Sequence, residues 1–277
     1  IAALVRTSDV ATSVLVRAKD LEPDNHGLMH VIDDIAGKRV GIFTGTVHDA
    51  FLTTHYPTVK VSRFEQTGDM ILSLKTGKID AAMFDLITAK LVLKRNPELG
   101  LLSDDVFETP LGVGFNKNNP ALLKEFNDFL REIMEDGTHA QMVERWMVND
   151  PESAVMPDFV EPATGKKLTV GVSVEDLPYV AYMNGQFVGF DIEMMRLFAQ
   201  RRNYKLELVV IEFPALVAAL ASGKVDLITD GISISEERAR QINFSDEYAM
   251  FRTGVIALKK NLAKYQDQSL EVEITPF

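Results

Sequence analysis

Residues 231–248 combine hydroxyl groups and a guanidinium at a spacing that suits the binding of a carboxylate. Ser233 and Ser235 follow a short apolar run, residues 225–228, which is typical of a buried strand. Ser235 is a candidate N-cap for a short helix that contains Arg238. A helix start favours negative charge, and the planar fork of an arginine matches two carboxylate oxygens. The alternative is an arginine on a solvated surface helix, which an isolated Ser-x-x-Arg would favour.

The composition is that of a folded, acidic protein. The 277 residues carry 29 Lys and Arg against 40 Asp and Glu, a formal net charge of −11, and 46% are hydrophobic. An acidic surface argues against nucleic acid and against an anionic membrane as main partners. The sequence has no cysteine, hence no disulfide and no thiolate metal site, and we expect neither a metal ion nor another cofactor. Because no apolar run approaches the ~20 residues of a membrane span, we expect no direct membrane insertion.

The order of predicted elements favours an open, largely parallel sheet with helices on its faces. Strands are predicted at residues 38–43, 59–63, 79–84 and 111–115. They alternate with helices predicted at residues 47–54, 69–76, 86–95, 120–135 and 139–147. Residues 148–166 contain three prolines and no periodic pattern, so they are predicted to be a linker. A second series follows, with strands at 168–173, 206–211, 225–228 and 252–259, helices at 191–202 and 214–221, a hairpin turn at Asn184-Gly185, and an unplaced strand at 270–275.

The motif around Arg238 resembles that of the type II periplasmic solute-binding proteins of family 3, the class that binds polar amino acids. The shared pattern is a Ser/Thr-rich turn, an arginine and then Phe-Ser-x-x-Tyr, which stands here as Phe244, Ser245 and Tyr248. The resemblance implies an α/β fold of two lobes, each a mostly parallel sheet flanked by helices, joined by hinge strands. It also implies a periplasmic or other extracytoplasmic location, a ligand cleft between the lobes and no catalytic residues.

The family's segments stand in an inverted order. In chain order we expect lobe two with a crossover strand at its start (1–110), and then the returning strand and closing helices of lobe one (111–147). A linker (148–166) and the first half of lobe one with its crossover strand (167–277) follow. The chain is then either a circular permutant or a piece of a tandem array. Two features fit a tandem parent: the strand-like start without a leader segment, and the crossover-like strands at both 1–6 and 253–259. We expect the complementary pieces to pair as one two-lobed body, because that buries both apolar faces.

The resemblance implies that the two charges of the ligand are bound from opposite lobes. Arg238 falls on the family's arginine for the carboxylate, and Asp85 falls on its aspartate for the ammonium group. Since a buried charge needs a partner, only a zwitterion satisfies both side chains. Asp85 follows a strand and precedes a helix, so it also fits an N-cap, and the two roles are compatible.

Further contacts are implied around this pair. Thr46 would offer its N–H and hydroxyl to the carboxylate, with an ordinary helix cap as the alternative. Ser233 and Gly231 would contact the carboxylate and the ammonium group, Gly231 through its backbone only. Phe213 matches an aromatic residue beside the ligand, although by itself it is typical of a core position. Tyr179 follows Pro178 at its family position.

Other positions near the site leave alternatives open. An acid at Asp176 would hold a cationic side chain or start the Asp-Leu-Pro turn, and the turn is favoured; the same holds for Glu175. His48 is predicted to face solvent from its helix rather than to reach the ligand. Val47 replaces a second hydroxyl of the family pattern, and Gly231 replaces a commoner serine.

Three functions follow from these patterns. The first is binding of a polar amino acid on behalf of an ABC transporter permease or a membrane receptor kinase, with tethering through another part of the parent chain. The second is an enzyme on the same scaffold, similar to a cyclohexadienyl or arogenate dehydratase, with Glu175 or Asp176 as general acid. The third is a degenerate, non-binding module, for which the departures at Val47 and Gly231 argue. The sequence has no Ser-His-Asp order, HExxH or P-loop to support other chemistry.

Overall fold

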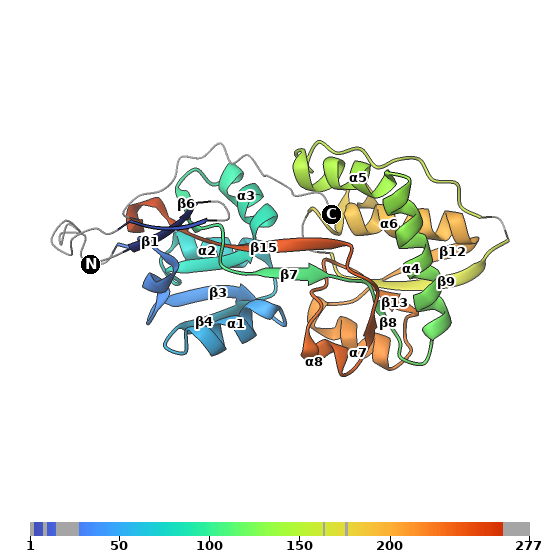
Figure 1. The fold of residues 1–277 in the computed structure, drawn as a ribbon, viewed down its shortest axis with the longest axis horizontal. Helices are drawn as coiled ribbons and strands as arrows, with labels where there is room; N and C mark the ends of the chain where they lie inside the picture. The colour runs from blue at the N-terminus through green and yellow to red at the C-terminus, as the bar shows by residue number, and fades with distance from the viewer. Residues whose placement is uncertain (1–2, 8–9, 15–27, 163, 175–176, 263–277) are drawn as a thin grey trace.

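The computed structural model describes residues 3–7, 10–14, 28–162, 164–174 and 177–262. They form two lobes side by side, and two strands, β7 (Glu108–Leu111) and β15 (Ala249–Leu258), lie between the lobes (Figure 1). β7 and the first half of β15 pair with each other antiparallel. The two-lobed α/β fold with hinge strands that the sequence predicted is confirmed.

The lobe that we call lobe two has a sheet with the strand order β4-β3-β5-β15-β6. Its strands are β3 (Arg39–Phe43), β4 (Lys60–Phe64), β5 (Ala81–Asp85), β6 (Leu99–Ser103) and the second half of β15. Its helices are η2 (Ile32–Ile35), α1 (Val47–His55), α2 (Thr67–Lys75), α3 (Leu86–Arg95) and η5 (Lys259–Asn261). Successive residues of β15 point to opposite faces, so Val255 and Ile256 belong to different apolar clusters.

The other lobe, which we call lobe one, has a sheet with the order β12-β9-β13-β8-β14. Its strands are β8 (Gly114–Phe115), β9 (Lys166–Val172), β12 (Tyr204–Val210), β13 (Leu227–Ile228) and β14 (Asn243–Phe244), and a hairpin consists of β10 (Ala181–Met183) and β11 (Gln186–Val188). Its helices are α4 (Pro120–Glu135), α5 (Thr138–Val143), the π-helical η3 (Glu144–Val148), α6 (Phe190–Arg202), η4 (Phe213–Ala215), α7 (Leu216–Ala221) and α8 (Glu236–Ala239). β9 is parallel to β12 and β13, whereas β8 is antiparallel to its neighbours.

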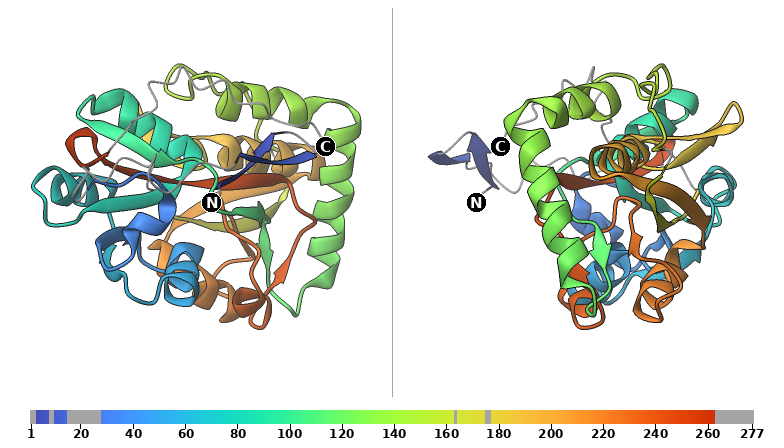
Figure 2. Two further views of the ribbon diagram at one scale, coloured as in Figure 1. Left: turned by 60° about the vertical axis from the view of Figure 1, so that its left-hand side comes forward. Right: turned by 90° about the vertical axis from the view of Figure 1, so that its right-hand side faces the viewer.

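Segments far apart in the sequence build lobe one together. Gly114 of β8 lies opposite both Ile228 and Phe244, so the middle of the chain pairs with its last third. α4, which runs along the outside of this lobe in Figure 2, packs its apolar face against α6, with the rings of Phe126 and Phe129 each 5.1 Å from that of Phe198. The back and front pieces of the family pattern therefore bury their apolar faces against each other within this chain.

The start of the chain forms a separate small sheet. β1 (Ala3–Thr7) and β2 (Val10–Val14) pair antiparallel with each other. Residues 1–6 were expected to hold a crossover strand, but among the described residues β1 joins neither lobe's sheet, and β15 is the strand that extends from one lobe to the other. Local strand propensity predicts β1, whereas sheet partners decide which strand crosses. The strand predicted at 270–275 lies outside the described residues.

Two further observations concern the whole chain. No helix or strand is assigned between η3 and β9 among the described residues. No described helix combines the length and the apolar character that crossing a bilayer requires.

Candidate ligand-binding site

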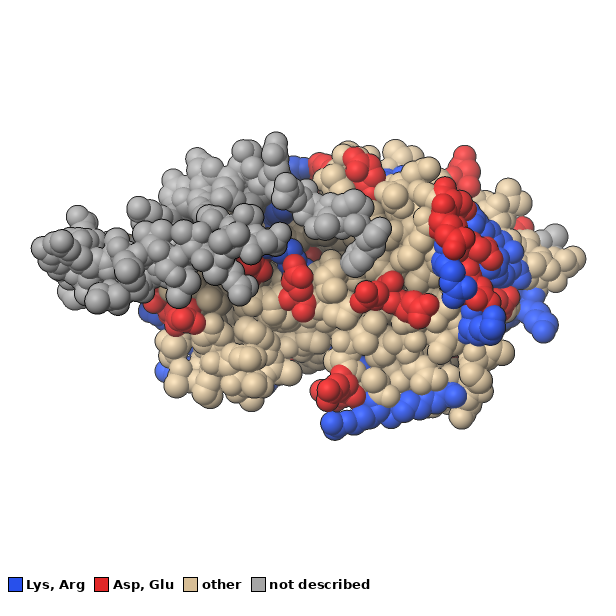
Figure 3. Space-filling model, in the orientation of Figure 1, with Lys and Arg blue, Asp and Glu red and all other residues tan. Residues whose placement is uncertain are grey.

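A cavity of about 100 Å³ lies between the lobes and is lined from both sides. Seven of the eight residues predicted for the site line it: Thr46, Asp85, Tyr179, Phe213, Gly231, Ser233 and Arg238. The eighth, Asp176, and its neighbour Glu175 lie outside the described residues. The structure also places Phe43, Val47, His48, Thr67, Thr88, Asp230 and Phe251 around the cavity. The space-filling surface is notched between the two lobes at the lower edge of Figure 3.

Arg238 is held by contacts from both lobes. The predicted cap is confirmed, because the hydroxyl of Ser235 accepts a hydrogen bond from the N–H of Arg238 at 3.3 Å. The guanidinium donates to the carbonyl oxygen of Ser233 and, across the cleft, to that of Gly45, both at 2.9 Å. It also lies over the ring of Phe213, 5.4 Å from the centroid, a cation–π geometry.

The guanidinium of Arg238 is desolvated, and within the described part of the chain its hydrogen-bond acceptors are backbone carbonyl oxygens. Burial lowers the pKa of Arg238 to about 10, and only the nearby charge of Glu237 acts against this. The two recorded acceptors are neutral backbone carbonyls, and a guanidinium has five N–H groups. A ligand carboxylate would therefore give the guanidinium of Arg238 a negatively charged hydrogen-bond partner.

Asp85 stands at the end of β5 and caps α3. Its carboxylate accepts a hydrogen bond from the N–H of Thr88 at 3.0 Å, which confirms the predicted N-cap. The side chain also lines the cavity, so the cap and a ligand contact are compatible here. The hydroxyl of Thr88 lies 3.5 Å from the carbonyl oxygen of Leu177 in the other lobe. The first turn of α3 thus adjoins both the cavity and lobe one.

The charges of three carboxylates act on Tyr179. Burial raises the pKa of Tyr179 well above its ordinary value, and the charges of Asp85, Asp191 and Asp230 raise it further. Asp230 lines the cavity and accepts a short hydrogen bond from Ser173. Sequence reasoning did not single out Asp230, although it lies in the same loop as Gly231. The cavity therefore contains more negative charge than the predicted pair of side chains implied.

The fully buried Asp191 organises the loop that follows β13. Its carboxylate accepts hydrogen bonds from Thr229 Oγ1 at 2.6 Å, from the N–H of Gly231 at 2.8 Å and from the hydroxyl of Tyr248 at 3.1 Å. Burial still dominates and raises the pKa of Asp191 to about 6. Because the N–H of Gly231 is used here, a backbone contact from Gly231 to a ligand would come from its carbonyl oxygen.

Gly231 has a structural reason to lack a side chain. Its φ is +55°, and a Cβ at this position would lie 2.7 Å from the ring of Tyr179. Few residues other than glycine adopt this backbone region without strain. Gly231, which stands where serine is commoner in the family, therefore leaves room for the ring of Tyr179.

Thr46 precedes α1, and its hydroxyl bonds a backbone carbonyl oxygen rather than the helix. Thr46 Oγ1 donates to the carbonyl oxygen of Phe43 at 2.9 Å and makes no capping hydrogen bond to the helix. A hydroxyl has one proton to donate, so it cannot simultaneously donate to a ligand carboxylate. The alternative of a side-chain helix cap is therefore wrong, whereas the contact of Thr46 with a ligand carboxylate stays a prediction.

His48 was predicted to face solvent, and this is wrong. Its side chain is 4% exposed and lies beside the rings of Phe107 and Phe251, with centroid distances of 5.8 and 6.1 Å. Its Nε2 lies 3.3 Å from Thr253 Oγ1, and burial lowers its pKa to about 4. Helical spacing alone did not reveal that the hinge strands cover the first turn of α1. For Phe213 the sequence left two positions possible, in the core or beside the ligand. In the structure Phe213 is half-buried and lines the cavity.

Two lobes joined by hinge strands, with a cleft lined from both, are the architecture of periplasmic binding proteins. The sequence profile of the bacterial extracellular solute-binding proteins, family 3, matches residues 9–149 and 168–274. The match covers most of the chain, so the chain belongs to this family, as the sequence predicted. The two matched stretches are separated by the region of the predicted linker.

Individual relatives match over shorter stretches. The chain is 33% identical over 118 residues to ABC transporter arginine-binding protein 1 of Escherichia coli, covering 41% of this chain and 49% of that protein. It is 32% identical over 127 residues to the L-cystine-binding protein TcyJ of Escherichia coli, covering 46% and 48%. The chain thus spans about half the length of these curated relatives. Among solved structures, the arginine-bound form of domain 1 from TmArgBP is 30% identical over 34% of this chain and 81% of that chain, with a TM-score of 0.29.

Proposed function

We propose that this chain binds a polar amino acid, or a similar small zwitterion, in the cleft between its lobes. One observation carries the proposal: Arg238 of lobe one and Asp85 of lobe two line the same cavity. A cation and an anion on opposite walls match the carboxylate and the ammonium group of an α-amino acid. The printed names of two relatives, an arginine-binding and an L-cystine-binding protein, support an amino acid as ligand.

The carboxylate of the ligand would bind the guanidinium of Arg238. Thr46, Val47 and His48 at the start of α1 line the same cavity, and the N–H groups of this helix start would favour negative charge. Ser233, whose side chain is 5% exposed and lines the cavity, would add a hydroxyl. The ring of Phe213, which lies against Arg238, would flank the bound molecule.

The ammonium group of the ligand would bind Asp85. The carbonyl oxygen of Gly231 and the carboxylate of Asp230 would complete its surroundings, since both residues line the cavity. Tyr179 would close this end of the site through its ring. This assignment gives each charge of the zwitterion a partner of opposite sign in a site that excludes water.

Closure would occur by rotation about the hinge strands β7 and β15, with lobe two moving relative to lobe one. The hydrogen bond from Arg238 to Gly45 and the contact between Thr88 and Leu177 already join the two walls. A bound ligand would add contacts to both lobes at once and would favour the closed arrangement.

We also propose the wider setting. The chain would serve a membrane permease or a receptor kinase from an extracytoplasmic position, tethered through another part of its parent chain. Its segments would divide into lobe two (1–110), the closing part of lobe one (111–147), a linker (148–166) and the first half of lobe one (167–277). The shared sheet of β8, β13 and β14 supports the grouping of the second and fourth segments.

A panel of amino acids in a thermal-shift assay tests the proposed function. A ligand that binds only the folded protein at 100 times its Kd stabilises it by about 2.7 kcal/mol. We expect at least one polar amino acid to raise the melting temperature, and Arg238→Ala to remove that shift. A panel that leaves the melting temperature unchanged, with chains first refolded to remove co-purified ligand, would contradict the proposal.

A further inference from the structure

Helix α3 has two buried faces that belong to different lobes. Leu86, Ala89 and Val92 lie in an apolar cluster of lobe two. Leu91, which is 9% exposed, belongs instead to the large cluster whose other members come from lobe one and the hinge strands, and Ile87 packs against that cluster. Residues four apart share one side of a helix, so Ile87 and Leu91 form a stripe that faces lobe one.

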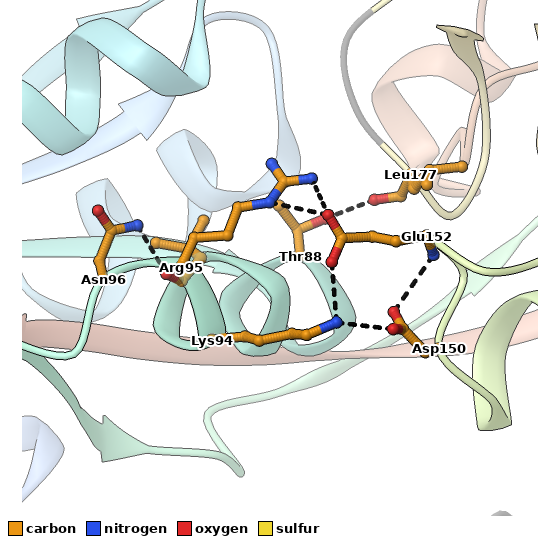
Figure 4. A network of polar contacts seen from close by, with 8 residues as sticks. Thr88, Lys94, Arg95, Asn96, Asp150, Glu152 and Leu177 are labelled. Atoms are coloured by element: carbon orange, nitrogen blue, oxygen red, sulfur yellow. Dashed lines mark hydrogen bonds and ion pairs between the residues drawn. The ribbon is translucent and has the colours of Figure 1, made fainter. Parts of the chain in front are cut away.

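The same side of α3 ends in a group of ion pairs with the segment that follows η3 (Figure 4). Lys94 Nζ lies 2.6 Å from Asp150 Oδ2 and 2.9 Å from Glu152 Oε2. Arg95 donates through Nε to Glu152 Oε1 at 3.0 Å and makes a second, short contact to the same oxygen through a terminal nitrogen. We call these four residues the inter-lobe clamp. None of them lines the ligand cavity.

The acidic half of the clamp is fixed to lobe one. The N–H of Asn149 donates to the carbonyl oxygen of Glu144 in η3, which ties the segment to the preceding helix. η3 is in turn anchored to α6, because the indole of Trp146 donates to the buried Glu193 at 2.6 Å. Within the turn, the N–H of Glu152 donates to Asp150 Oδ1 at 3.2 Å. The two carboxylates therefore move with lobe one, whereas Lys94 and Arg95 move with lobe two.

We propose that the inter-lobe clamp, together with the apolar stripe of α3, holds the two lobes closed before any ligand arrives and so sets the balance between open and closed forms. α3 carries the cavity residues Asp85 and Thr88 at its start and the clamp at its end. Because α3 carries both groups as one rigid helix of lobe two, a rotation of lobe two that moves Asp85 and Thr88 relative to lobe one also changes the distances of Lys94 and Arg95 from Asp150 and Glu152. The inference rests on the proposed function only in that the closed form is the one that would hold the ligand.

Salt dependence follows from the exposure of the clamp. The side chains of Lys94 and Arg95 are 54% and 57% exposed, so each pair by itself is weak and is screened by salt. The ion pairs of the inter-lobe clamp nevertheless act together on an equilibrium between an open and a closed form, which differ in free energy by only a few kcal/mol. Loss of the clamp should therefore change the ratio of open to closed molecules more than it changes folding.

Single-molecule energy transfer in the ligand-free protein tests this proposal. The chain has no cysteine, so dyes can be attached to Thr54→Cys on α1 and Ala239→Cys on α8, both exposed and on opposite lobes. In Lys94→Glu/Arg95→Glu we expect the ratio of open to closed molecules to rise about tenfold. Reversal of both partners, by adding Asp150→Lys/Glu152→Lys, should restore the wild-type ratio. In the wild type, raising the salt from 0.05 to 1 M should shift the ratio in the same direction as the charge reversal.

The matched control is Lys124→Glu/Arg131→Glu on α4, which makes the same charge change at pairs that stay within lobe one. It should leave the ratio unchanged. If a reversed variant does not fold, Lys94→Gln/Arg95→Gln provides the same comparison. Equal ratios in the wild type and in every clamp variant that folds would overturn the proposal. This readout needs no ligand, so it separates failure of the clamp from failure of amino-acid binding.

Discussion

The guanidinium of Arg238 in lobe one donates a hydrogen bond to the carbonyl oxygen of Gly45 in lobe two at 2.9 Å. This bond connects helix α8 with the turn before α1, and both segments contribute residues to the cavity wall. The arginine is therefore both a candidate ligand contact and a bridge between the lobes. Substitutions at this residue should separate these roles.

Replacement of Arg238 by alanine should weaken ligand binding by about 2–5 kcal/mol, because the ligand carboxylate loses its charged partner while Asp85 remains. Arg238→Lys keeps the charge but not the two-pronged geometry, so it should recover only part of the affinity. Isothermal titration with the amino acid found in the thermal-shift panel measures both values. Equal affinities for the alanine variant and the wild type would show that Arg238 does not bind the ligand.

Gly231→Ala should destabilise the protein by more than the same change at Gly223. Both glycines have positive φ, +55° and +78°, but a Cβ on Gly231 would meet the ring of Tyr179 at 2.7 Å, whereas Gly223 has no neighbour within 4 Å. The backbone strain common to both sites costs about 1–2 kcal/mol. The clash at Gly231 should add a further cost of about 1–3 kcal/mol, as overpacking does in a core. Denaturant unfolding of the two variants gives the comparison, and equal losses would contradict this account of the loop.

His48 should make the protein less stable in mild acid. Its folded pKa of about 4 lies below the ordinary 6.5, so its contribution is present above pH 6.5 and is lost as the pH falls toward 4. Between pH 7 and pH 5 the loss is about 2 kcal/mol. Asp191 acts in the opposite direction, because its pKa is raised to about 6 and its contribution is lost as the pH rises through that value.

The effect of His48 therefore appears as a difference between two proteins rather than in the wild type alone. His48→Gln cannot take up the proton, so the stability advantage of the wild type over this variant should shrink by about 2 kcal/mol from pH 7 to pH 5. Urea unfolding at both pH values measures the change. An advantage that stays constant would mean that the histidine is not held neutral by burial.

Much of the fold was predictable from local patterns. α3 and α4 begin and end at the predicted residues, because Asp85 and Asn119 cap them and Asn96-Pro97 and Gly137 follow their ends. The family resemblance likewise located half of the residues that line the cavity, seven of fourteen. Such signals lie within a few residues of one another, so the sequence alone reveals them.

What escaped prediction depends on contacts between distant segments. His48 is buried by hinge residues more than 50 positions away, and β1 lacks the sheet partners that a crossover strand needs. The hydroxyl of Thr46 fitted a helix cap by its position, but it bonds the carbonyl oxygen of Phe43 instead. Residues 150–152 belong to the predicted linker, yet the carboxylates of Asp150 and Glu152 form ion pairs with α3. No local pattern encodes which surface a polar segment will contact.

Isothermal titration of Asp85→Asn against two ligands tests the central claim most directly. With the amino acid that binds the wild type, the variant should lose affinity, because the ammonium group loses its charged partner on lobe two. With the analogue of that amino acid that lacks the amino group, the variant should bind at least as tightly as the wild type, since there is no positive charge for Asp85 to hold and its negative charge repels the ligand carboxylate. If the wild type bound the amino acid and its deaminated analogue with the same affinity, a zwitterion held between Arg238 and Asp85 would be ruled out.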